Sequence, residues 1–139
     1  MKKKLTRRVF IENTAKVMAA TGLMAGASYT APRKTDFEQL FIHHVFFWLG
    51  QPLTDDKRKK FEKALKNLVM VETIVSYHLG IPAATNREVI DSSYTYSLLT
   101  TFRNKKDQDI YQTHPIHLKF IEECSELWEK VVVYDSVTI

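Results

Sequence analysis

A stretch rich in apolar and aromatic residues runs from Leu40 to Leu49 and predicts a β-strand. Its ten residues and its content of Phe, Ile, Val and Trp favour a strand over a helix. Successive side chains of a strand point to opposite faces. The two resulting sets are His44, Phe46 and Trp48, and His43, Val45, Phe47 and Leu49. Because both sets are largely apolar, the pattern predicts that both faces of this strand are covered.

The rest of the chain alternates between helical and strand periodicities. Thr54 suits a helix N-cap, and apolar residues at helical spacing follow it as far as Val69. Clean alternation from Ser93 to Phe102 predicts a strand. The other expected elements are strands over 73–79 and 131–137 and helices over 105–111 and 115–129. This order predicts an α+β fold built on a ferredoxin-like βαββαβ unit, in which one antiparallel sheet carries its helices on a single face.

The second face of such a sheet has no helix to cover it. Leaving an apolar strand in contact with water costs on the order of 25 cal/mol per Å², a large penalty for a small domain. A second copy of the chain is the simplest cover. We therefore expect a homodimer in which the two sheets face each other.

The first residues have the pattern of an export signal, with a basic start, a short apolar run and small residues at the end. Arg7 and Arg8, with Phe10 two positions later, resemble the twin-arginine type, which directs a protein to the periplasm without anchoring it. A basic amphipathic N-terminal helix is the alternative. The expected divisions are a twin-arginine-type signal peptide over 1–27, a flexible leader over 28–39 and a folded domain over 40–139.

The signal segment accounts for the positive charge of the chain. It holds six of the 20 basic residues and one of the 16 acidic residues, which leaves 14 basic and 15 acidic residues. The remainder lacks the basic surface that nucleic-acid binding requires, and we expect no such partner. Cys124 is the only cysteine, so no intramolecular disulfide forms. Because no cysteine stands near the end of the signal, we also expect no stable membrane anchor after export.

The most chemical stretch of the sequence places Tyr111, His114 and His117 within seven positions. Pro115 lacks an N–H and suits the first turn of a helix, so a helix is predicted to begin there. Residues three or four apart share a helix face. The face neighbours of His117 are Phe120, Ile121 and Cys124. His117 is therefore predicted to point inward, where an imidazole needs a hydrogen-bond partner or a function.

Five segments together resemble the stress-responsive A/B barrel (Dabb) family over residues 40–137. They are His44-Val45-Phe46-Phe47-Trp48-Leu49, Gly80, Tyr94-Thr95-Tyr96-Ser97-Leu98, Tyr111-x-x-His114-Pro115-x-His117-x-x-Phe120 and Val133-Tyr134-Asp135. The fourth is the most specific. The resemblance implies a dimeric α+β barrel. The family often has a lysine where Leu49 stands here, so the resemblance implies no role for a cation at this position.

The resemblance extends to olivetolic acid cyclase, a family member that closes a linear polyketide by an aldol step. It implies that His117 is a general base, that Tyr111 supports it, and that His44 lines the pocket. A histidine can remove a proton beside a carbonyl, and a phenol can hydrogen-bond the oxygen on which charge develops. The remaining residues expected to contact a ligand are Phe46, Trp48, Tyr96 and His114. We expect a small apolar ligand, no cofactor and no metal.

Other interpretations of the same residues stay open. In a purely structural one, His114 stabilises the chain before Pro115, His117 bonds a buried carbonyl and Tyr111 only packs. In a carrier, the pocket exists but performs no chemistry. Metal ligation by His114 and His117 or haem binding, as in other dimeric α+β barrels, is a further alternative. The sequence thus predicts an exported Dabb-like protein that handles a small hydrophobic molecule, and leaves catalysis undecided.

Overall fold

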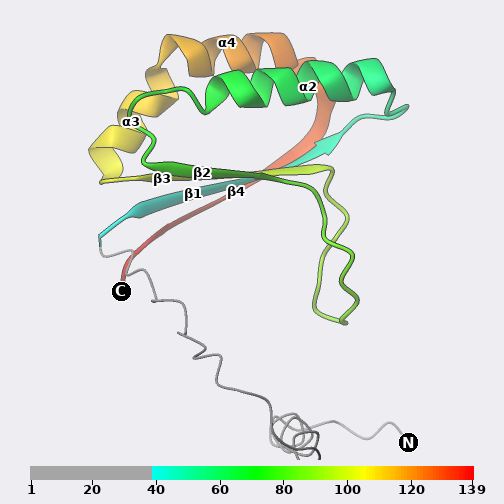
Figure 1. The fold of residues 1–139 in the computed structure, drawn as a ribbon, viewed down its shortest axis with the longest axis horizontal. Coiled ribbons are helices and arrows are strands. Elements are labelled where there is room, and N and C mark those ends of the chain that lie inside the picture. Colours follow the sequence, from blue (N-terminus) through cyan, green and yellow to red (C-terminus); the bar gives the residue numbers. More distant parts are fainter. Residues whose placement is uncertain (1–38) are drawn as a thin grey trace, which may run out of the picture. The chain divides into compact units, whose positions relative to one another are not determined.

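The computed structural model describes residues 39–139, which form an antiparallel sheet with its helices on one face (Figure 1). The predicted export signal and all but the last residue of the predicted leader lie outside this range. The strands are β1 (Phe41–Leu49), β2 (Ser76–Gly80), β3 (Tyr96–Phe102) and β4 (Trp128–Val137). The helices are α2 (Asp55–Leu68), α3 (Lys105–Thr113) and α4 (Pro115–Cys124), with a 3₁₀ turn at Ser125–Leu127.

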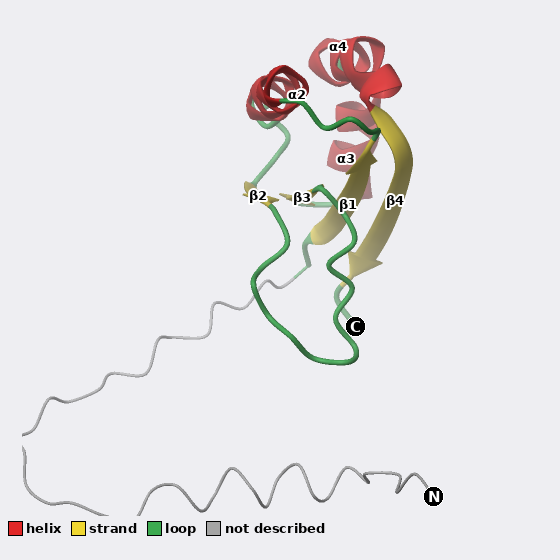
Figure 2. Cartoon of the chain, turned by 90° about the vertical axis from the view of Figure 1, so that its right-hand side faces the viewer, coloured by secondary structure: helices red, strands yellow, loops and turns green. Residues whose placement is uncertain are grey.

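The sheet has the strand order β2-β3-β1-β4, with every neighbouring pair antiparallel. β1 is therefore an inner strand, and β2 and β4 form the two edges. Figure 2 shows the same layers from the side, with α2, α3 and α4 together on one side of the sheet. The predicted ferredoxin-like α+β architecture is confirmed by this topology. None of the helices in residues 39–139 is long and apolar enough to cross a bilayer.

Helix α2 begins where the sequence predicts. The Lys57 N–H donates a hydrogen bond to the Thr54 side-chain oxygen at 3.2 Å, which satisfies one of the free donors at the helix start. Asp55 and Asp56 stand in the first turn, where the helix dipole favours carboxylates. The residues that α2 buries against the sheet are Phe61, Leu65 and Leu68.

The prediction for the last helix was wrong at its C-terminus. α4 ends at Cys124, and Trp128 already belongs to β4, where it pairs with Leu49. The Trp128 ring also stacks on Phe120, with centroids 5.8 Å apart. Strand pairing and ring packing thus outweigh the helical preference of the intervening residues. The second and third strands likewise begin later than expected, at Ser76, where pairing with β3 starts, and at Tyr96, which pairs with Phe47 of β1.

The hydrophobic core fills the space between the sheet and the helices. Its centre is aromatic: the Phe61 ring lies 5.1 Å from Phe47 and 5.8 Å from Phe120, centroid to centroid. Every second residue of β1 from His43 to Leu49 is buried in this layer. The alternate residues His44, Phe46 and Trp48 point to the opposite, helix-free face and are only partly buried. This helix-free face is called the open face below.

Candidate functional site

A cavity of about 180 Å³ lies between the sheet and helices α3 and α4. Most of its wall is apolar, and its polar groups come from one strand and from the junction of the two helices. The residues that line it are His43, Val45, Phe47, Leu68, Leu98, Tyr111, Gln112, His117, Phe120, Ile121, Trp128, Val131 and Val133. The cavity is thus built from the helix-facing sides of β1, β3 and β4 and from the inner faces of the helices.

The strand register sets His43 beside a carboxylate. His43 of β1 pairs directly with Asp135 of β4, so the two side chains lie on the same face of the sheet. The His43 Nδ1 and Asp135 Oδ1 atoms are 2.7 Å apart, a distance typical of a charge-assisted hydrogen bond. His43 is 5% exposed, whereas the Asp135 side chain keeps 45% of its surface in solvent. The imidazole therefore reaches the cavity while its carboxylate partner stays hydrated.

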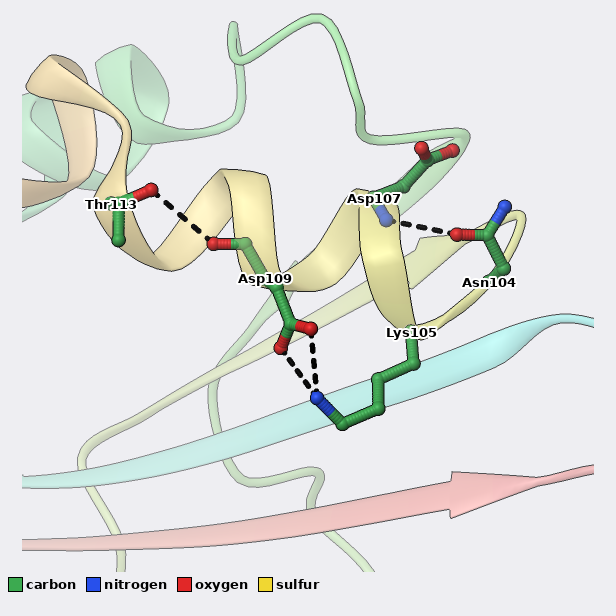
Figure 3. A network of polar contacts seen from close by, with 5 residues as sticks. All are labelled: Asn104, Lys105, Asp107, Asp109 and Thr113. Carbon is green, nitrogen blue, oxygen red and sulfur yellow. Dashed lines mark hydrogen bonds and ion pairs between the residues drawn. The ribbon is translucent and has the colours of Figure 1, made fainter.

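Helix α3 brings Tyr111 to the same cavity. Local polar contacts stabilise this helix (Figure 3). The Asn104 side chain caps it by accepting a hydrogen bond from the Asp107 N–H at 2.9 Å, and Lys105 forms an ion pair with Asp109 at 2.7 Å. Tyr111 is 1% exposed, and burial raises the pKa of its phenol. The hydroxyl consequently keeps its proton at physiological pH and can act as a hydrogen-bond donor.

His117 stands in the first turns of α4, next to Tyr111. The two ring centroids are 4.7 Å apart, and the Tyr111 ring lies 6.0 Å from that of His43. The phenol thus lies in contact with one imidazole and close to the other. Pro115 at the start of α4 fixes where this helix begins, and so places His117 one half-turn further on.

The surroundings of His117 favour its neutral form. Burial lowers the pKa of His117, the Gln112 backbone opposes part of this effect, and the nearby His43 lowers the pKa further. The Nδ1 atom of His117 is buried and forms no hydrogen bond of good geometry within residues 39–139. A buried polar atom without a bond of good geometry is costly in a folded protein, and the Gln112 backbone is the group that acts on this ring as a hydrogen-bond partner.

Comparison with known proteins identifies the family. The family model described as "Stress Responsive A/B Barrel Domain" matches residues 41–138, which is more than half of the chain. The chain belongs to the stress-responsive A/B barrel (Dabb) family. A stress-response A/B barrel domain-containing protein of Arabidopsis thaliana is 27% identical over 82 residues, covering 58% of this chain and 73% of the relative. The family predicted from the sequence is thereby confirmed.

Solved structures resemble this Dabb domain in fold. The hydroxynitrile lyase from Passiflora edulis has a TM-score of 0.63 at 20% identity, over 73% of this chain and 94% of the lyase. A dimeric ferredoxin-like protein of unknown function from Thermobifida fusca has a TM-score of 0.60 at 15% identity, over 76% of this chain and 96% of its own. At these identities the similarity establishes the fold, which thus occurs in an enzyme and in a dimer.

Three predicted ligand contacts of the Dabb domain do not lie near His117. His44, Phe46 and Trp48 point to the open face, so the expectation that they share one cavity with Tyr111 and His117 is wrong. The alternation was correct, but the helices cover the other set of β1 side chains. On the open face, Phe46 and Trp48 instead border a separate hollow of about 140 Å³. Its other lining residues are Asp91, Tyr94 and Tyr134.

Tyr96 and His114 also lie outside the cavity. The Tyr96 hydroxyl donates to the Glu62 carboxylate at 2.7 Å and borders a different hollow, between α2 and the end of β2. His114 Nδ1 accepts the Ile116 N–H at 3.1 Å and so caps α4, and its Nε2 lies 3.3 Å from Glu72. The structural interpretation of His114 is thus correct, and its ring is occupied at both nitrogens.

The prediction missed His43 and Asp135 as site residues. The alternation of β1 did group His43 with Val45 and Phe47, but nothing in the pattern indicated which group the helices would cover. Asp135 was noticed only as part of a family segment. Within residues 39–139, no three His, Cys, Asp or Glu side chains gather as a metal site would require. The imidazoles and the phenol of the cavity can supply hydrogen bonding and proton transfer.

Proposed function

We propose that this Dabb domain binds a small, uncharged, largely apolar molecule in the cavity between the sheet, α3 and α4. One observation carries the proposal: a largely apolar cavity has two imidazoles and a phenol gathered in its wall. Binding sites for small molecules are mostly apolar, with a few polar groups that fix the orientation of the ligand.

The size and charge of the cavity support this class of ligand. An apolar cavity of about 150 Å³ is large enough for benzene, so a cavity of about 180 Å³ accommodates a ring with a short substituent. No Lys or Arg is among the residues that line it. An anionic ligand would therefore lose its hydration without gaining a permanent counter-charge.

Binding can be tested at the mouth of the cavity. Ile121 lines it and is 40% exposed, whereas Leu118, on the same helix, is 56% exposed and lies outside it. The Ile121→Trp variant should obstruct the cavity, and Leu118→Trp is the matched control. We expect uncharged ketones and hydroxynitriles of six to ten carbons to shift the NMR signals of Val45 and Val133. The Ile121→Trp variant should bind these compounds at least tenfold more weakly.

Two outcomes would refute ligand binding in the cavity. One is that no compound of the series shifts the signals of the lining residues in the wild type. The other is that Leu118→Trp weakens binding as much as Ile121→Trp, because the effect would then come from the helix surface rather than from the cavity.

Proton-transfer catalysis of a lyase or cyclase type is the second candidate function. The presence of the same fold in a hydroxynitrile lyase supports it, and so does an imidazole whose pKa is lowered by burial and which is therefore neutral near pH 7. A protonated phenol beside it can donate to an oxygen on which negative charge develops. In this function an imidazole of the cavity acts as general base.

We further infer that the domain forms a homodimer through its open face. The partly buried aromatic residues of that face and the dimeric state of a protein with the same fold support this arrangement. The domain would then carry one cavity per copy, each on the outer side of its own sheet.

We also propose that the protein is exported to the periplasm by the twin-arginine route. The paired arginines and the short apolar run of residues 1–27 support this proposal. Cell fractionation should find the wild type in the periplasm and the Arg7→Lys, Arg8→Lys double variant retained in the cytoplasm. Equal delivery of both proteins would exclude recognition of the arginine pair.

A further inference from the structure

We propose that His43, oriented by Asp135, is the group that accepts a proton from the bound molecule, and that His117 is a hydrogen-bond partner of that molecule. The proposal rests on the ligand site proposed above. It differs from the role of general base that the sequence predicts for His117.

The hydrogen bond between His43 and Asp135 determines which ring nitrogen is free. An ionised carboxylate can only accept hydrogen bonds, so at a separation of 2.7 Å the proton between the two residues belongs to His43 Nδ1. In the neutral ring, Nε2 then carries the lone pair. Because His43 lines the cavity and its Nδ1 is occupied, Nε2 is the nitrogen left for a ligand. Asp135 is thus a positioning residue.

The same pair can stabilise the product of proton transfer. When an O–H or C–H group of the ligand gives its proton to His43 Nε2, the bonding electron pair stays on the ligand, which becomes an anion. The imidazolium formed remains in contact with the Asp135 carboxylate, so the positive charge is balanced where it arises. The proton later returns from Nε2 to the ligand or its product, and the site is regenerated without any other reactant.

Unlike His43, His117 forms no ion pair with a carboxylate within residues 39–139. The groups that act on its ring are Tyr111, the Gln112 backbone and the imidazole of His43, and none of these carries a negative charge at neutral pH. A proton placed on His117 would add a charge to a largely apolar cavity next to a second ring that can also become positive. A neutral His117 and a protonated Tyr111 are instead suited to hydrogen-bonding the ligand.

The tautomer of His43 can be observed directly. Long-range ¹H–¹⁵N NMR at pH 8 should show the wild-type ring protonated at Nδ1 and bare at Nε2. In Asp135→Asn an amide replaces the carboxylate, and we expect this preference to be lost or reversed. Asp109→Asn removes a surface carboxylate that pairs with Lys105 and should leave His43 unchanged. A wild-type ring protonated at Nε2 would overturn the proposal.

Proton transfer can be followed without knowledge of the natural substrate. Phenylacetone is uncharged, fits the size class of the cavity and has acidic hydrogens beside its carbonyl. In D₂O the wild type should accelerate exchange of these hydrogens for deuterium. His43→Asn and Asp135→Asn should each slow the exchange at least tenfold while phenylacetone still binds, whereas His117→Asn should mainly weaken binding.

The possible failures can be told apart. If phenylacetone binds but its exchange is not accelerated, or is as fast in His43→Asn as in the wild type, the role of His43 is refuted and the ligand site stands. If exchange in the bound state depends on His117 alone, the assignment of the two imidazoles is reversed and the proposal fails. If neither phenylacetone nor any compound of the series binds, the ligand site itself is refuted, and proton transfer with it.

Discussion

Single side chains in the cavity have environments that sequence patterns do not reveal. The family resemblance predicted that Tyr111 supports His117, and the structure brings their rings into contact. The partner of His43 could not be found in this way, because Asp135 lies 92 positions further along the chain. A hydrogen bond between such distant residues depends on the register of two strands, and register follows from the complete sheet.

Folding should become less stable as the pH falls, and His117 should contribute to this. Burial holds the pKa of His117 below its ordinary value of 6.5. Below about pH 6.5 the unfolded chain therefore binds a proton that the folded chain refuses, and the free energy of unfolding decreases. Chemical denaturation of His117→Phe between pH 7.5 and 5 should show a shallower decrease than the wild type.

The pH dependence should be reduced in this variant and not abolished, because burial also lowers the pKa of His44. Leu118→Ala, on the exposed side of the same helix, introduces no titratable change and should keep the wild-type slope. A slope in His117→Phe equal to that of the wild type would show that His117 is protonated as easily in the folded as in the unfolded state.

At the level of elements, alternation and capping were predictable and boundaries between elements were not. The two faces of β1 were assigned correctly as sets, and Thr54 and Pro115 mark true helix starts. Which face of β1 receives the helices follows from how the crossover connections pack, and both faces carry a histidine and aromatic rings. The ends of α4 and β4 depend on the pairing of Trp128 with Leu49, a long-range contact.

Edge strand β2 should be sensitive to its last residue. A Cβ atom added at Gly80 would lie 2.8 Å from Ser97 Oγ and 2.9 Å from a ring carbon of His78. We expect Gly80→Ala to cost about 1–3 kcal/mol of unfolding free energy, the range for overpacking, as measured by urea denaturation. Ser97→Ala in the same chain should recover part of this loss.

Gly50→Ala is the matched control. There the added Cβ would meet only the Glu129 side chain, at 3.2 Å or more, and this flexible side chain can move. Equal costs for the two glycine substitutions, or no recovery on Ser97→Ala, would show that crowding against Ser97 does not limit the space at Gly80.

At the scale of the whole molecule, the open face is the surface through which we propose that the homodimer assembles. The Phe46 ring lies 4.9 Å from that of Tyr94 and 6.1 Å from that of Tyr134, so the aromatic residues of β1, β4 and the β2–β3 loop form one continuous group. The loop itself extends from the sheet on the side away from the helices (Figures 1 and 2). An aromatic group of this kind on a helix-free face is suited to contact a second copy.

A charge placed in this group should separate the copies. Phe46→Glu would have to lose its hydration in the proposed dimer, so we expect sedimentation velocity to find a dimer for the wild type and a monomer for the variant. Leu118→Glu places the same charge on the outer side of α4 and should remain dimeric. A wild-type monomer at micromolar concentration, or a dimer that tolerates Phe46→Glu, would refute assembly through the open face.

In the proposed complex, the ligand lies on the helix side of the sheet, beside His43 and His117. Strand β4 offers an internal reference, because Val131 and Val133 line the cavity whereas Val132 pairs with Phe46 on the open face. Nuclear Overhauser effects between bound phenylacetone and the valine methyl groups test this claim most directly. We predict contacts to Val131 and Val133 and none to Val132; contacts to Val132 without the other two would contradict it.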